Sequence, residues 1–285
     1  MKKELKKRII SMLATAFICM PLAAAEKADS PNFVKANAEQ SPYGSYYVTD
    51  DNGVVCTANM ATLNKGNMMW FPESMFTSNE QLPVIVWANG TMCAPALYYD
   101  FLSQVAASGY IVVANTELFA GNGQEQKASI DFILAEDCDP DSVFYGKIDE
   151  EHIGVMGHSQ GGMSSVNCAN LDSRVDCVFS IAGNSSKSSA SNLNVPTFFA
   201  TGDRDLIVPS WLYVKPAYNA CKAPAVYANV KNAMHTTVCS NPSVYSKYAI
   251  KWFDAYLKDS SKSAFRSGGE LFKDSAWSNV ASKRI

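Results

Sequence analysis

Short apolar runs alternate with helical stretches through most of this chain of 285 residues. The run 83–88, Pro-Val-Ile-Val-Trp-Ala, is apolar at every position, which is typical of a parallel strand buried on both faces. Further strands are expected at 110–114, 152–156, 175–182, 197–200 and 225–230, with helices at 95–108, 124–135, 160–170 and 242–258. Parallel strands need helical crossovers, so this order predicts an α/β fold, with a mostly parallel central sheet and helices on both of its faces.

The first 25 residues have the features of a cleaved signal peptide. Five basic residues precede a short apolar stretch at 9–20, and Ala23-Ala24-Ala25 offers small residues for cleavage. The stretch is too short to span a bilayer comfortably, so we expect no stable membrane anchor and a secreted or periplasmic protein. Cleavage leaves 19 Lys and Arg against 26 Asp and Glu, a formal net charge of −7. An acidic protein of this kind does not suit nucleic acid as a partner.

The rest of the chain divides into three parts. Residues 26–42 are small and polar, and we expect a flexible N-terminal segment there. One domain is expected over 43–258, which begins with short strands at 45–49, 53–57 and 67–71 separated by Asp-Asn-Gly and Asn-Lys-Gly turns. The C-terminal extension 259–285 is Ser- and Lys-rich, and its few apolar side chains favour packing back on the domain.

The motif G-x-S-x-G joins the strand expected at 152–156 to the helix expected at 160–170. It consists of Gly157-His158-Ser159-Gln160-Gly161. Such a nucleophile elbow lifts the serine hydroxyl out of the sheet in a sharp turn. Gly157 and Gly161 lack a Cβ, which lets the backbone pass close to itself. The helix N-terminus favours negative charge nearby, so the motif predicts Ser159 as a nucleophile.

A serine nucleophile needs a base, and this chain has only three histidines. After an elbow of this type the acid comes next along the chain and the histidine last. His152 precedes the strand, and His158 lies inside the elbow, where we expect a structural role. Only His235 follows Ser159, so we predict it as the base.

Two aspartates compete for the role of the acid that holds the tautomer of His235. Asp203 and Asp205 both follow the strand expected at 197–200, and whichever of them is not the acid would be a turn residue. We favour Asp205, four residues before Pro209. The oxyanion of the reaction needs two N–H donors, which we expect to be the amides of Gln160 and of Thr91.

The segments VIVWANGT, GHSQGG and TGDRDLIVP, together with the late His235, resemble the α/β-hydrolase superfamily over about residues 43–257. They are most similar to its secreted, lidless branch of cutinase-like polyester hydrolases, platelet-activating-factor acetylhydrolase-like and chlorophyllase-like esterases. The resemblance implies Ser159 as nucleophile, Asp205 as acid, His235 as base, and Thr91 and Gln160 as oxyanion amides. The polyester hydrolases of this branch share an aromatic clamp, but the corresponding places here, Thr91 and 183–186, hold no aromatic residue.

Only 46 positions separate Ser159 from Asp205, which leaves no room for a lid domain between them. We therefore predict an open cleft and a serine esterase that forms an acyl-enzyme with a small-molecule or polymeric ester. One alternative is depolymerisation of a polyester such as cutin or polyethylene terephthalate. Another, of a different class, is a catalytically silent binding protein with a hydrolase fold.

Seven cysteines remain after cleavage of the leader, which in an exported protein suggests disulfides and one free thiol. Our favoured pairs are Cys221 with Cys239, on either side of the strand expected at 225–230, and Cys168 with Cys177. No Cys and His spacing typical of zinc is present, so we expect no metal and no cofactor. We expect a monomer.

Overall fold

One mixed β-sheet organises the part of the chain that the structure describes. The computed structural model describes residues 39–40, 46–57 and 66–285, which belong to one unit that starts at residue 37. The expected signal peptide at 1–25 and nearly all of the segment 26–42 lie outside the described residues. Within the described residues the sheet has eleven strands, in the order β1-β2-β3-β4-β6-β5-β7-β8-β9-β10-β11.

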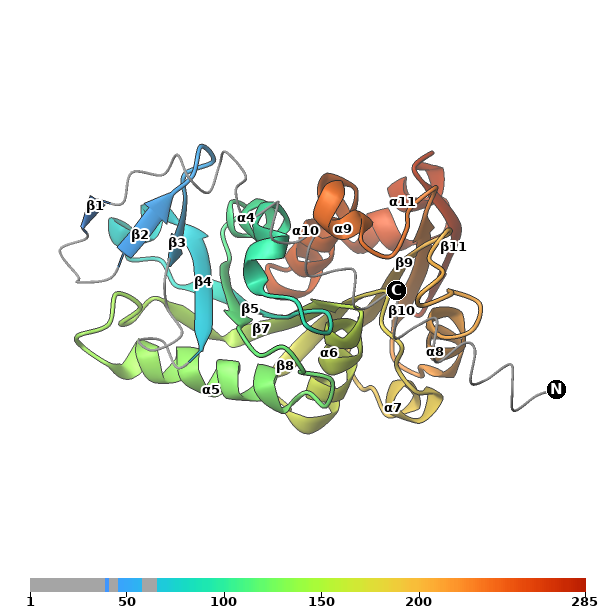
Figure 1. Cartoon of the computed structure of the whole chain (residues 1–285), viewed down its shortest axis with the longest axis horizontal. Coiled ribbons are helices and arrows are strands. Elements are labelled where there is room, and N and C mark those ends of the chain that lie inside the picture. Colours follow the sequence, from blue (N-terminus) through green and yellow to red (C-terminus); the bar gives the residue numbers. More distant parts are fainter. Residues whose placement is uncertain (1–38, 41–45, 58–65) are drawn as a thin grey trace. The chain divides into compact units, whose positions relative to one another are not determined.

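The centre of the sheet is parallel and its two edges are antiparallel (Figure 1). The strands are β1 (Glu39–Gln40), β2 (Tyr46–Thr49), β3 (Val54–Thr57), β4 (Asn67–Pro72), β5 (Leu82–Ala88), β6 (Ile111–Asn115), β7 (Ile148–His158), β8 (Val175–Ile181), β9 (Thr197–Gly202), β10 (Ala225–Val230) and β11 (Trp277–Lys283). From β6 through β5, β7, β8 and β9 to β10, every neighbouring pair is parallel. Strands β1 to β4 extend one edge antiparallel, and β11 does so at the other. The predicted parallel centre is confirmed.

Helices cover both faces of the sheet, as the alternation predicts. They are the 3₁₀ turns η1 (Glu73–Phe76), η2 (Pro95–Tyr98) and η3 (Lys262–Phe265), and the helices α4 (Tyr99–Ala106), α5 (Gln124–Cys138), α6 (Gln160–Leu171), α7 (Lys187–Ser191), α8 (Val214–Ala220), α9 (Thr237–Ser240), α10 (Ser243–Leu257) and α11 (Glu270–Lys273). One apolar core lies between the sheet and α4, α9 and α10, and the other between the sheet and α5, α6, α7 and α8. Figure 1 shows these two groups of helices on opposite sides of the strands.

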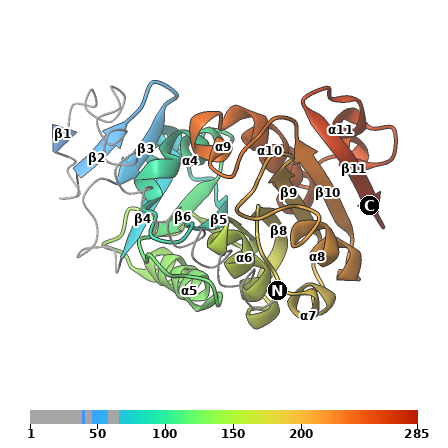
Figure 2. The ribbon, with the colours of Figure 1, turned by 45° about the vertical axis from the view of Figure 1, so that its right-hand side comes forward.

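The C-terminal extension is part of the sheet. Its strand β11 pairs antiparallel with β10, which places it at the outer edge in Figure 2. Leu271 and Trp277 are buried in the core that contains α10. The extension thus packs on the domain as expected, but it does so through a strand that its sequence does not predict.

The short helices also differ from the sequence expectations. The region 183–194, for which no helix is expected, contains α7, whose first turn is capped by the Ser186 side chain accepting a bond from the Ser189 amide. Between β8 and β9 this five-residue helix is the only one among the described residues, so no lid domain is inserted there. No helix in the described ranges has both the length and the apolarity needed to cross a bilayer.

Candidate active site

The elbow lies where β7 ends and α6 begins. Ser159 stands between the two elements with φ of 58° and ψ of −118°, a left-handed conformation that is strained for a residue with a side chain. Its amide donates to the carbonyl of Ile181 at 2.8 Å, which ties the turn to the end of β8. This turn holds the serine at the carboxyl edge of the parallel strands.

The two glycines of the motif are where the backbone passes closest to itself. A Cβ on Gly157 would overlap the carbonyl group of Gly161, and a Cβ on Gly161 would overlap the carbonyl oxygen of Ala88. These contacts bring the first turn of α6 against the end of β5. The elbow and the loop after β5 are therefore held together by backbone packing.

Three side chains from distant parts of the chain meet beside the elbow. Ser159 Oγ lies 2.9 Å from His235 Nε2, and His235 Nδ1 lies 2.7 Å from Asp205 Oδ2. Because the carboxylate can only accept, Nδ1 carries the proton and Nε2 is left to accept from the serine hydroxyl. All three side chains are nearly buried, with residue exposures of 4–7%. The arrangement has the geometry of a nucleophile, a base and an orienting acid.

The two candidate aspartates have different surroundings. Asp205 is buried, and its Oδ1 accepts from the amides of Ile207 and Val208 at 2.9 and 2.8 Å. These bonds leave Oδ2 facing His235. Asp203 is exposed, and its side chain makes no hydrogen bond within the described residues. The structure brings Asp205, and not Asp203, to the histidine.

The loop after β5 offers one uncommitted amide beside the serine. The Gly90 amide donates to the Tyr98 hydroxyl, and the Met92 amide donates to the Leu118 carbonyl at 2.8 Å. Among the described residues, the Thr91 amide between them donates no hydrogen bond. A Cβ on Gly90 would lie 3.6 Å from the Ser159 Cβ, so this loop borders the nucleophile.

The second expected amide is that of Gln160, the first residue of α6, which directly follows Ser159. The side-chain oxygen of Gln160 accepts from the Ala120 amide at 3.2 Å, and this bond holds the loop after β6 against Gln160. Helix α6 also directs the positive end of its dipole at this position. The amides of Thr91 and Gln160, the two expected oxyanion donors, therefore both lie beside Ser159.

His158 contacts His235 and is hydrogen-bonded on both sides of its ring. It is buried, its ring lies 4.6 Å from that of His235 between centroids, and both of its nitrogens are hydrogen-bonded. One partner is Tyr98, which the sequence analysis does not single out. Tyr98 lies in a 3₁₀ turn 60 positions earlier in the chain, and no motif in the sequence marks it.

Large apolar side chains are exposed on the loops that carry the site. They follow the carboxyl ends of β5, β6, β9 and β10, and we call them the apolar rim: Met92 (51% exposed), Leu118, Phe119 (61%), Leu206 (87%), Trp211 (72%), Leu212 and Met234 (64%). The residues on either side of Phe119 are both hydrogen-bonded: Leu118 to Met92, in the loop after β5, and Ala120 to Gln160. Phe119 therefore lies between that loop and Gln160. Thr91 and the region 183–186 hold no aromatic side chain, but the rim supplies Phe119 and Trp211 from other loops.

The predicted disulfides are wrong in this structure. Cys221 is an unbridged thiol in the core under α8, whereas Cys239 packs against the core on the other face of the sheet. Cys168 and Cys177 are likewise unbridged and lie on opposite faces. Cys177 points to the face of the sheet opposite α6, and Cys221 at the end of α8 lies on the face opposite α9 and its Cys239, so closeness in sequence did not bring the sulfurs together.

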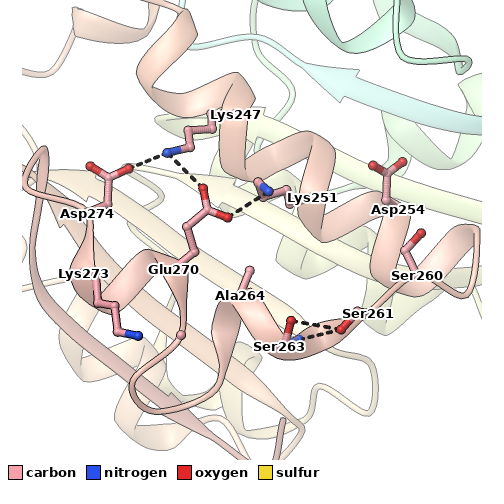
Figure 3. A pocket seen from close by; sticks show the side chains of 11 residues that line it. Lys247, Lys251, Asp254, Ser260, Ser261, Ser263, Ala264, Glu270, Lys273 and Asp274 are labelled. Atoms are coloured by element: carbon pink, nitrogen blue, oxygen red, sulfur yellow. Dashed lines mark hydrogen bonds and ion pairs between the residues drawn. The ribbon is translucent and has the colours of Figure 1, made fainter.

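No group of three or more metal-ligating side chains occurs within the described ranges. A cavity of about 850 Å³ lies between α10 and the C-terminal extension, and it contains neither the serine nor its partners. Figure 3 shows two of its lysines paired with carboxylates: Lys247 reaches Asp274 and Glu270, and Lys251 reaches Glu270. The charges of these two lysines are therefore balanced within the protein.

The sequence matches a known protein family and several named proteins. Residues 35–279 match the model of the family described as "PETase: PET hydrolase-like". The bis(hydroxyethyl) terephthalate hydrolase of Streptomyces coelicolor is 24% identical over 69% of this chain and 64% of its own length. Cutinase est2 of Thermobifida alba is 24% identical, and cutinase cut1 of Thermobifida fusca 22%, each over 56% of this chain. The chain spans 54% and 51% of the length of those two relatives.

Proposed function

The chain belongs to the PET hydrolase-like family, and we propose that it is a serine hydrolase that cleaves carboxylic esters through an acyl-enzyme. The single observation that carries the proposal is the hydrogen-bonded series Ser159–His235–Asp205, with bonds of 2.9 and 2.7 Å. The relatives that it resembles by sequence include cutinases and a bis(hydroxyethyl) terephthalate hydrolase, whose names describe ester cleavage.

The geometry supports the following steps. His235 Nε2 takes the proton of the Ser159 hydroxyl as Oγ attacks the ester carbonyl carbon. The carbonyl oxygen becomes negative, and the amides of Thr91 and Gln160 stabilise it. Protonated His235, held by Asp205, gives the proton to the leaving alcohol oxygen, and the C–O bond breaks to leave an acyl-enzyme. Water then attacks the acyl carbon with the same base, which releases the acid and restores the serine.

Turnover of p-nitrophenyl acetate and butyrate tests this mechanism directly. Ser159→Ala should remove activity, whereas Ser188→Ala, on the exposed surface of α7, should keep it. A fluorophosphonate probe should label wild type on Ser159. Full activity of Ser159→Ala would exclude the serine mechanism, and a wild type that neither turns over esters nor takes the label would favour a silent binding protein.

The apolar rim favours a second candidate function, hydrolysis of a polyester. A solid polymer presents an extended apolar surface. Contact with it would remove exposed side chains such as Phe119 and Trp211 from water, which lowers the free energy of the bound state. Among the described residues no lid domain is inserted between β8 and β9 to cover the rim. The different positions of these aromatics suggest a grip on the polymer that differs from the clamp of the similar polyester hydrolases.

Release of soluble products from a polyester film, beside p-nitrophenyl butyrate turnover, separates the two functions. Phe119→Ser should slow film hydrolysis several-fold and leave butyrate turnover within about twofold. Tyr145→Ser, an exposed aromatic of similar size that lies outside the rim, is the matched control. If wild type releases no product from the film, the polyester function is excluded while the esterase function stands.

We propose in addition that the mature enzyme is an exported monomer that begins after residue 25. Export and cleavage rest on the composition of residues 1–25, and the monomeric state is an expectation from the sequence that the experiment below tests. N-terminal sequencing of the protein from the periplasm or medium should find a start at or near Glu26, and size-exclusion chromatography with light scattering should give the mass of one mature chain. An intact leader on the exported protein would contradict cleavage.

A further inference from the structure

His158, the residue before the nucleophile, is hydrogen-bonded at both ring nitrogens. Nδ1 lies 3.0 Å from the Tyr98 hydroxyl, and Nε2 lies 2.8 Å from the backbone carbonyl oxygen of His235. Tyr98 Oη in turn accepts from the Gly90 amide at 3.2 Å. Tyr98 and His158 are both buried, so each of these bonds is shielded from water.

The chemistry of the partners fixes the direction of each bond. A carbonyl oxygen only accepts, so His158 Nε2 carries a hydrogen and donates it to His235. In a neutral imidazole Nδ1 then accepts, and the Tyr98 hydroxyl donates to it. Burial and the neighbouring His235 lower the pKa of His158 well below its ordinary value of 6.5, which keeps the ring neutral. In this series the Gly90 amide donates to the Tyr98 hydroxyl, the hydroxyl donates to His158 Nδ1, and His158 Nε2 donates to the His235 carbonyl.

This series of hydrogen bonds connects the two loops whose positions the reaction depends on, the loop after β5 and the loop that carries His235. At one end is Gly90, next to the oxyanion amide of Thr91. At the other end is the main chain of His235, the base. The Trp87 ring packs on Tyr98 with 4.7 Å between centroids, which fixes the tyrosine from the side of β5.

We propose that Tyr98 and His158 are positioning residues. They fix the oxyanion loop, residues 89–94, and the base loop, residues 231–236, relative to each other on the two sides of the elbow. The inference rests on the ester hydrolysis proposed above, which it deepens. Neither residue touches the substrate. They act by fixing the backbone on both sides of Ser159, where small misplacements of a donor or a base slow the chemical step.

The neutral state of His158 has a second consequence for the base. His235 becomes positively charged when it takes the serine proton, and its ring lies against the ring of His158. A charged His158 would repel it. The Tyr98 hydroxyl, by donating to Nδ1, favours the form of His158 that carries no charge.

Tyr98→Phe tests the proposal with the least change in shape, because it removes only the hydroxyl. Both Gly90 N–H and His158 Nδ1 lose their partner. We expect kcat per active site to fall about 5- to 100-fold, as for the loss of two net hydrogen bonds, with KM within about twofold. Tyr110→Phe is the matched control. It removes a hydroxyl that donates to Asp254 at a distance of 2.7 Å, in a part of the fold remote from the elbow.

Two substitutions of His158 separate the two bonds. His158→Gln places its amide near the position of Nε2 and keeps a donor for the His235 carbonyl, whereas His158→Asn places it near Nδ1 and keeps an acceptor for Tyr98. In Tyr98→Phe/His158→Gln the loss in kcat should be smaller than the product of the single losses, because both changes interrupt one series.

The readouts distinguish positioning from mere stability. Active sites are counted by fluorophosphonate titration, and affinity for an alkyl boronic acid reports the oxyanion and base geometry. In Tyr98→Phe the boronic acid affinity should fall in parallel with kcat. Wild-type kcat per titrated site, or a change in unfolding midpoint alone, would overturn the proposal. Activity in Ser159→Ala would instead overturn the function on which it rests, so the two failures are distinct.

Discussion

Asp205→Asn exchanges one carboxylate oxygen for an amide nitrogen and leaves the shape of the side chain almost unchanged. In the wild type Oδ1 accepts from the amides of Ile207 and Val208, and Oδ2 accepts from His235 Nδ1. An amide nitrogen cannot accept the two backbone bonds, so the oxygen stays with them. The new NH₂ group therefore faces His235.

Two donors cannot pair, and the His235 ring must then accept at Nδ1 and carry its proton on Nε2. That proton points at Ser159 Oγ, which removes the base. We expect kcat to fall by about 10⁴-fold, as for loss of the correct tautomer in other serine triads, or about 5.4 kcal/mol in the barrier. The two backbone bonds persist, so the unfolding midpoint should change little.

The assay compares kcat on p-nitrophenyl butyrate for Asp205→Asn and Asp203→Asn, with thermal unfolding measured on the same samples. Asp203 is the competing aspartate of the same loop and is exposed, so its variant should keep activity within about threefold. The reasoning is refuted if Asp205→Asn stays within tenfold of wild type, or if Asp203→Asn loses as much activity as Asp205→Asn.

Three further predictions concern stability. Gly161→Ala, whose Cβ would overlap the Ala88 carbonyl oxygen, should lower the free energy of unfolding by about 3 kcal/mol or more in denaturant titration, and an unchanged midpoint would contradict the close packing of the elbow. Gln126 is fully buried and its Nε2 donates to the carbonyls of Val86 and Met156, so Gln126→Leu should cost about 1–3 kcal/mol in the same assay; a neutral effect would show that these bonds add no net stability. The lowered pKa of His158 means that the unfolded chain binds a proton below about pH 6.5 that the native chain does not, so stability should fall as the pH drops below that value, by up to about 1.4 kcal/mol per pH unit. His158→Gln should reduce this slope, and an equal slope in both proteins would show that His158 does not titrate in this way.

The sequence predicts the central sheet well because its signal there is strong. Strand β10 has the predicted bounds 225–230, and α10 differs from its prediction by one residue at each end. Continuous apolar runs between helical stretches leave few alternatives for such segments. The elbow is equally local, since its glycines and serine lie within five residues.

The missed elements have weak local signals. Helix α8 contains Pro216 within its first turn, and β11 is an edge strand of mixed polarity whose only buried side chain is Trp277. The pairing of β11 with β10 depends on contacts between segments about 50 positions apart. Tyr98 was missed for the same reason, because only the folded chain brings its hydroxyl to His158.

The disulfide prediction failed because each pair is divided between the two faces of the sheet, and for Cys177 the cause is strand parity. Cys177 and Val178 are neighbours in β8, yet they belong to opposite cores. A shift of one position changes the face to which a side chain points. Sequence spacing alone does not fix that parity for a cysteine at a strand end.

The division of the thiols between the two faces makes them reporters of local opening. Cys56 and Cys177 lie in the core with α4 and α10, and Cys168 and Cys221 in the core with α5, α6 and α8. Burial raises the pKa of Cys168 to about 12 and that of Cys177 well above its ordinary value, so neither reacts as a thiolate until its layer opens. Alkylation followed over time by peptide mass would thus compare the opening rates of the two helical layers in the wild-type protein.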